Sequence, residues 1–123
     1  MKLQEIVELL GANVVFGPDT LLQEEVRTAA ASDLMSDILA RVDVPEILLT
    51  RLNNSQVMRT AAVFGIKAVV IVRGRSINEK MTELAQEEEI VLLSTPASLF
   101  ESCGQLFALG LRSAQKPAEQ SRP

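Results

Sequence analysis

Residues 66–96 constrain the fold of this chain most, because they have the pattern of a complete strand–helix–strand unit. Two short apolar runs rich in β-branched residues, 68–72 and 90–93, are typical of strands that are covered on both faces. Between them, apolar side chains recur at the spacing of one helix face, at Ile77, Met81, Leu84 and Ala85. The pattern predicts two parallel strands joined by a helix that packs on one face of a sheet.

Capping signals predict where two helices begin. Ser76 and Glu79 have the S-x-x-E spacing of a capping box, which places the start of the helix in this unit at residue 77. Thr95 followed by Pro96 has the pattern of an N-cap and a first helical residue. A last helix is therefore expected from Pro96 to Gly110, with an apolar face made of Leu99, Phe100, Cys103, Leu106 and Phe107.

The remaining elements follow from shorter patterns. The alanine-rich run 28–31 has helical propensity but stands where a strand is expected, so its conformation stays open. A short helix is expected after Asp33, whose carboxylate suits a helix N-terminus. The other expected elements are a helix over 2–10, a strand over 13–16, a strand over 47–50 and a helix that starts after Asn54, exposes Thr60 and ends at Gly65.

The length of 123 residues fits one domain. The residues after Leu111 are polar and contain prolines, so we expect a domain over residues 1–111 and a flexible tail over residues 112–123. Hydrophobic residues make up 47% of the chain and aromatic residues only 3%, so the core must consist of aliphatic side chains.

Charge and composition argue against several classes of protein. No run approaches the roughly 18 apolar residues that a membrane-spanning helix needs, so we expect a cytoplasmic protein without a membrane partner. One cysteine and no histidine exclude an internal disulfide and the common zinc and haem ligand sets, and no cofactor is expected. The net charge of −4 argues against nucleic acid as a partner.

Four segments of the chain resemble a stand-alone DRTGG domain: KLQEIVELLGANVVFG, ASDLMSDILA, ILLTRLNNSQVMRTAAVFGIKAVVIVRGR and EEIVLLSTPASLFE. The resemblance covers residues 1–111 and extends to the N-terminal domain of HPr kinase/phosphorylase. It implies a three-layer α/β/α fold around a mixed, largely parallel sheet, a homodimer, and a regulatory role without a catalytic motif. One position of the family's glycine pair is occupied by an arginine, in Arg73-Gly74-Arg75.

Candidate binding residues lie where strands are followed by helices, because the N–H groups of a helix N-terminus attract anions. They are Asp33, Asn53, Asn54, Arg73, Gly74, Arg75, Ser94 and Thr95. Capping and turn formation already explain several of these residues and are the favoured interpretation, and ligand binding stays open as the alternative.

Two further features have a functional and a structural interpretation. Asp33 and Asp37 are one helical turn apart, so their carboxylates could bind magnesium or could be a cap and a solvated charge. Cys103 lies on the predicted apolar face, where a thiol is an inert packing group unless a base activates it.

These observations favour a non-enzymatic regulatory or interaction module that acts as a homodimer, beside a separately encoded enzyme or a CBS-type partner. The alternative is a sensor that binds a small phosphorylated or adenine-nucleotide ligand at the strand-to-helix loops. An enzyme would need Asp, Glu, Lys or Cys for acid–base chemistry, since histidine and tyrosine are absent.

Overall fold

The structure of the chain is a computed structural model that describes residues 1–40 and 43–114. Within these residues, a six-stranded mixed sheet has the strand order β1-β5-β4-β3-β2-β6. Strands β2 to β6 run parallel to their neighbours, and β1 pairs antiparallel with β5 at one edge. The strands are β1 (Asn13–Phe16), β2 (Thr28–Ala31), β3 (Ile47–Thr50), β4 (Ala68–Ile71), β5 (Val91–Ser94) and β6 (Arg112–Ser113).

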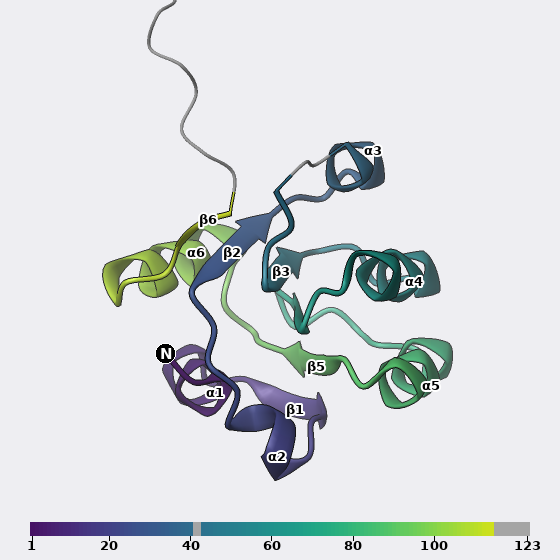
Figure 1. Cartoon of the computed structure of the whole chain (residues 1–123), viewed down its shortest axis with the longest axis horizontal. Helices are drawn as coiled ribbons and strands as arrows, with labels where there is room; N and C mark the ends of the chain where they lie inside the picture. The colour runs from purple at the N-terminus through teal and green to yellow at the C-terminus, as the bar shows by residue number, and fades with distance from the viewer. Residues whose placement is uncertain (41–42, 115–123) are drawn as a thin grey trace, which may run out of the picture.

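Helices cover both faces of the sheet, which gives the expected three-layer α/β/α fold (Figure 1). The helices are α1 (Leu3–Leu10), α2 (Asp19–Leu22), α3 (Met35–Leu39), α4 (Ser55–Phe64), α5 (Glu79–Glu88) and α6 (Leu99–Ala108). Helices α1, α2 and α6 lie on one face, and α3, α4 and α5 lie on the other. No helix in the described part of the chain is both long and apolar enough to cross a membrane.

The predicted unit of two parallel strands and a helix is confirmed as β4, α5 and β5. Side chains of each strand alternate between the two apolar layers, so that Val70 faces α1 and α6 while Val69 and Ile71 face α4 and α5. Every residue of β3 and β4 is buried, as expected for strands that are covered on both sides. The α/β unit predicted from these apolar runs and the three-layer fold implied by the family resemblance are therefore both confirmed.

Residues 28–31, whose sequence is compatible with a helix or a strand, form strand β2. Register explains this outcome, because Ala29, Ala30 and Ala31 pair with Ile47, Leu48 and Leu49 of β3. Pairing in a parallel ladder overrides the helical propensity of three alanines.

Both helix starts predicted from capping signals are wrong. Helix α5 begins at Glu79, and its N-cap is Asn78, whose side chain accepts a hydrogen bond from the N–H of Met81. Helix α6 begins at Leu99, where Ser98 and Glu101 form a capping box. Ser76 and Thr95 therefore precede their helices instead of capping them.

Three smaller expectations also need correction. Thr60 is buried in α4 and not exposed. Phe100 and Phe107 of α6 were expected on its buried face, but they are 86% and 62% exposed. Arg112 and Ser113, expected in the tail, form β6 and pair with Thr28 and Ala29. The rest of the predicted tail, from residue 115, lies outside the described residues.

Candidate functional site

All eight predicted site residues lie at the ends of β2, β3, β4 and β5 or in the loops that follow them. These four strands run parallel, so their carboxyl ends share one edge of the sheet. This edge is where open α/β sheets usually bind ligands. The polar groups there can bind a ligand only if they are not already bonded within the protein.

Asp33, after β2, is bonded to the end of β3. Its carboxylate accepts hydrogen bonds from the Arg51 N–H at 2.7 Å, the Arg51 Nε at 2.6 Å and the Thr50 hydroxyl at 3.3 Å. Partial burial raises the pKa of Asp33, but the hydrogen bonds and charge of Arg51 outweigh burial, and the pKa lies below its ordinary value. Asp33 is thus a charged anchor between two strands.

Asp33 does not cap α3, contrary to expectation, because the N-cap of that helix is Leu34. Asp37 lies in the first turn of α3, whereas Asp33 lies outside the helix, so the two carboxylates are not one helical turn apart. Across residues 1–40 and 43–114, no group of three or more Cys, Asp or Glu side chains could hold a metal ion. The geometry gives no support to the magnesium interpretation.

The two asparagines after β3 have different structural roles. Asn54 is the N-cap of α4 and accepts a hydrogen bond of 3.1 Å from the N–H of Val57. Asn53 reaches the next loop, where its Nδ2 donates a hydrogen bond of 3.0 Å to the carbonyl oxygen of Ser76. These bonds fit the capping interpretation.

The loop after β4 is held against the loop after β5. Arg73 and Gly74 both have left-handed backbone conformations, with φ of 67° and 60°. Their N–H groups donate hydrogen bonds of 2.9 Å and 2.8 Å to the carbonyl oxygens of Ala97 and Thr95. These two donors are thus bonded within the protein, while the Arg73 and Arg75 side chains are exposed.

Thr95 is fully buried at the end of this series of contacts. Its hydroxyl donates to the carbonyl oxygen of Leu10, at the end of α1, and accepts from the N–H of Ala97 at 3.2 Å. Ser94, the last residue of β5, is half-buried and pairs with Asn13 of β1 and Ile71 of β4. Thr95 is therefore a structural link and is inaccessible to a ligand.

Together, these bonds form what we call the loop belt: Asp33 to Thr50 and Arg51, Asn53 to Ser76, Arg73 and Gly74 to Ala97 and Thr95, and Thr95 to Leu10. The structure does bring the predicted site residues together at one edge. It brings them together mainly by bonding them to one another and to neighbouring backbone, and the exposed guanidinium groups of Arg73 and Arg75 stay suited to an anion.

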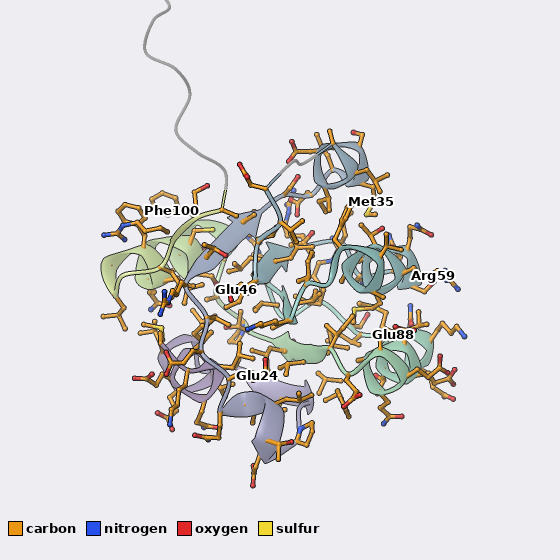
Figure 2. The ribbon with its side chains drawn as sticks, viewed as in Figure 1. Glu24, Met35, Glu46, Arg59, Glu88 and Phe100 are labelled. Carbon is orange, nitrogen blue, oxygen red and sulfur yellow. The ribbon has the colours of Figure 1, made fainter. Side chains whose placement is uncertain are left out.

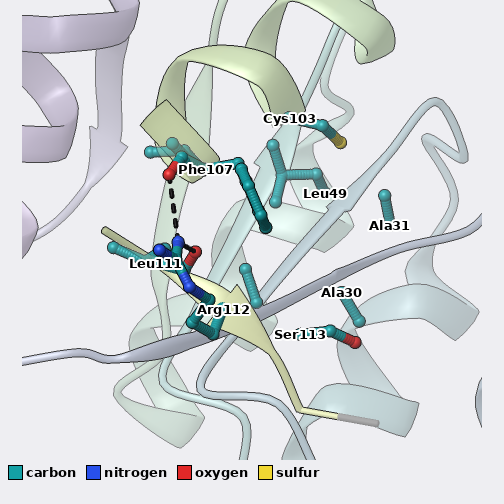
Figure 3. Close-up of a pocket in the computed structure, with 10 residues that line it drawn as sticks. Ala30, Ala31, Leu49, Cys103, Phe107, Leu111, Arg112 and Ser113 are labelled. Atoms are coloured by element: carbon teal, nitrogen blue, oxygen red, sulfur yellow. Dashed lines mark hydrogen bonds between the residues drawn. The ribbon is translucent and has the colours of Figure 1, made fainter. Parts of the chain in front are cut away.

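A second candidate region lies between α6 and β2, on the face of the sheet that α6 covers (Figure 3). A groove of about 250 Å³ is lined there by the alanines of β2, by Leu49 and by Cys103, Leu106 and Phe107 of α6. Burial raises the pKa of the Cys103 thiol, so this group is a packing side chain and not a thiolate nucleophile. We call this region the β2–α6 groove.

Arg112 closes one end of the β2–α6 groove. Its guanidinium carbon lies 4.4 Å from the centre of the Phe107 ring, and its Nη1 donates to the carbonyl oxygens of Phe107 and Leu111 at 3.1 Å and 2.8 Å. Phe107 is thereby fixed at the mouth of the groove. Phe100 lies near the start of α6 at the outer surface (Figure 2).

The DRTGG domain model matches residues 5–107, most of the chain. The chain belongs to the DRTGG domain family. This DRTGG domain is not significantly similar to any curated protein.

The fold of this DRTGG domain matches a solved structure from Clostridium perfringens with a TM-score of 0.67 and 13% sequence identity. That structure contains the CBS and DRTGG domains of the regulatory region of a pyrophosphatase, complexed with its activator, diadenosine tetraphosphate. The match covers 85% of this chain and 45% of that chain, so this DRTGG domain spans less than half of its neighbour.

Sequence reasoning missed the exposed aromatic side chains of this DRTGG domain. Two apolar pairs in α6 have the same seven-residue spacing, Leu99 with Leu106 and Phe100 with Phe107. Both were expected to face the sheet, but only the leucine side of the helix does so. The Ser98-x-x-Glu101 spacing was a visible signal for the start of α6 at Leu99, but it does not decide which side of the helix faces the sheet.

Proposed function

We propose that this DRTGG domain is a non-enzymatic regulatory or interaction module that acts as a homodimer. The observation that carries the proposal is the exposure of two phenylalanines on one helix, at 86% for Phe100 and 62% for Phe107, in a chain that has only four. Exposed apolar side chains that adjoin a groove are typical of a protein interface.

The chemistry of the described side chains favours a module over an enzyme. The chain has no histidine or tyrosine, so a proton donor or acceptor near neutral pH would have to be an unusual carboxyl, amine or thiol. Hydrogen bonds keep the pKa of Asp33 low despite partial burial, and burial raises the pKa of the Cys103 thiol. Both shifts move these groups away from the values that suit acid–base or nucleophilic catalysis.

The proposed partners are a second copy of the chain and a separately encoded enzyme or CBS-type protein in the cytoplasm. The Clostridium perfringens neighbour supports the second part, because its DRTGG domain occurs with CBS domains in the regulatory region of an enzyme.

Light scattering coupled to size exclusion tests the homodimer. We expect twice the mass of 13.4 kDa at micromolar protein concentration. The proposal would be contradicted if the protein stays a monomer at every concentration from about 1 to 100 μM. This is the range in which weak dimers with a Kd of about 1 μM to 100 μM form.

A ligand sensor is the second candidate, favoured by one observation: the neighbouring Clostridium perfringens structure is a complex with the activator diadenosine tetraphosphate. As a sensor, this DRTGG domain would bind phosphate groups of an adenine nucleotide with the exposed guanidinium groups of Arg73 and Arg75. The bonded N–H groups of Arg73 and Gly74 weigh against it.

Thermal shift separates the two candidates, since a ligand that binds the folded state raises Tm by mass action. A sensor predicts a Tm increase with millimolar diadenosine tetraphosphate or ATP that disappears in Arg73→Ala/Arg75→Ala. Asn78→Ala is the matched control, because it weakens a helix cap on the same loop without removing charge. No shift of the parent with either nucleotide leaves the interaction module as the function.

A further inference from the structure

One side of α6 presents an apolar surface that continues into the β2–α6 groove. Phe100 and Phe107 are two helical turns, or about 10.5 Å, apart on the same side of the helix. Cys103 and Gly104 lie between them on this side. Gly104 is exposed, and a Cβ atom added to it would meet nothing within 4 Å. The surface therefore consists of two exposed aromatic rings with a shallow depression at Gly104 between them.

The groove beside this surface exists because β2 has small side chains. Ala29 and Ala31 face the same apolar layer as α6, together with Leu49 of β3. Methyl groups do not fill the space between the strand and the helix, and about 250 Å³ stays open.

Charge indicates which partner suits the surface. The surface and its groove contain two charged side chains of opposite sign, Glu101 and Arg112, so they carry no net charge, although 23% of the whole chain is charged. The chain has a net charge of −4, so two copies repel each other at most relative orientations. A surface without net charge is where two copies of an acidic chain can approach with least repulsion.

We propose that a second copy of this chain docks on this surface, with the two α6 helices antiparallel about a twofold axis that passes near Gly104. This arrangement places Phe100 of each chain opposite Phe107 of the other, where its ring covers the partner's β2–α6 groove. The inference rests on the proposed homodimer and names the surface through which it forms.

The two exposed rings supply a large part of the area that a stable dimer needs. A phenylalanine buries about 150–250 Å² when it is covered, and a standard interface buries roughly 800 Å² per partner. Two rings of this size supply about half of that area, and the proposed dimer requires the remainder from the residues around them. The depression at Gly104 lets the two helix backbones approach closely enough for both rings to be covered.

The first test compares two aspartate substitutions at exposed apolar positions. Phe100→Asp should raise the dimer Kd at least 100-fold, measured by sedimentation or light scattering across a concentration series. Val63→Asp is the matched control, because Val63 is 79% exposed on α4, on the opposite face of the sheet, and this substitution should leave the Kd unchanged.

The second test fills the groove without adding charge. Ala31→Leu places an isobutyl group in the space that the partner's Phe100 would occupy, so the dimer should weaken at least 10-fold. The far-ultraviolet circular dichroism and Tm of the variant report whether the monomer is still folded.

The third test reports the position of the twofold axis. In a Cys103→Ala background, Gly104→Cys should form an intermolecular disulfide on mild oxidation, because the two sulfur atoms would lie close to the axis. Val63→Cys in the same background is the control and should stay reduced at the same protein concentration.

The outcomes separate this inference from the proposed function. A parent that is monomeric throughout the concentration series overturns both. A dimeric parent whose Kd is unaffected by Phe100→Asp and Ala31→Leu overturns the docking surface and leaves the homodimer standing. Efficient crosslinking at position 63 instead of position 104 would place the interface on α4.

Discussion

The hydroxyl of Thr95 donates a hydrogen bond of 2.7 Å to the carbonyl oxygen of Leu10, which is 85 positions away in the chain. The bond joins the end of α1 to the loop after β5, and both residues are buried. It lies at one end of the loop belt.

Replacing Thr95 by valine tests this link. The valine keeps the shape of the side chain but leaves the buried carbonyl of Leu10 without this donor, which should lower the free energy of unfolding by about 1–3 kcal/mol. Urea unfolding measures the change. Thr95→Ser retains the hydroxyl and should cost less, and equal losses in the two variants would mean that the methyl group matters more than the hydrogen bond.

The start of α5 gives a prediction with a built-in control. Asn78→Ala removes the side chain that accepts from the Met81 N–H at 2.9 Å, and should cost about 1 kcal/mol of unfolding free energy. Ser76→Ala should change stability by less than about 0.5 kcal/mol, since an exposed side chain away from a cap contributes little. If Ser76→Ala lowered the free energy of unfolding more than Asn78→Ala does, Ser76 and not Asn78 would be the N-cap.

The carboxylate of Asp33 makes stability depend on pH. Because the pKa of Asp33 is lower in the folded protein than its ordinary value of 3.8, its contribution is fully present above about pH 4 and is lost as the pH falls through the folded pKa. The difference in unfolding free energy between the parent and Asp33→Asn should therefore be largest at neutral pH and should shrink below about pH 4. A difference that stays constant down to pH 2 would contradict the role assigned to the Arg51 contacts.

Strand β6 gives a prediction about truncation. A chain that ends at Leu111 loses the hydrogen bonds from the Arg112 and Ala114 N–H groups to the carbonyl oxygens of Arg27 and Ala29. It should be less stable than a chain that ends at Ala114 by about 1–3 kcal/mol, as judged from two backbone hydrogen bonds at 0.5–1.5 kcal/mol each. Thermal unfolding of the two truncated chains measures the difference, and equal Tm values would mean that β6 is dispensable.

The central strands could be predicted because their signal is local. Continuous apolar runs such as those of β3 and β4 have few alternatives to a strand that is covered on both faces. Strand β2 could not be predicted, since an alanine run becomes a strand only through its pairing with β3. The short strand β6 depends likewise on a partner more than 80 residues away.

The sequence indicated that the candidate residues lie at one edge of the sheet, but it did not indicate which of them are hydrogen-bonded to one another there. Strand order places the loops after β2 to β5 at one edge, and that much follows from parallel strands alone. Whether the N–H of Gly74 faces solvent or bonds to Thr95 depends on how closely two loops approach, and no sequence spacing encodes that distance. The same holds for α6, where rotation of the helix about its axis decides whether Leu99 or Phe100 is buried.

The loop belt also determines how this edge of the domain opens. Backbone amides in exposed loops usually exchange their protons with solvent rapidly, but the amides of Arg73 and Gly74 are held by carbonyl groups of the neighbouring loop. Since each loop is anchored on the next, one loop cannot detach without releasing the acceptors of another. We therefore expect the amide protons of these loops to exchange slowly and in a correlated way. From the sequence alone, the same loops would be expected to behave as four independent turns.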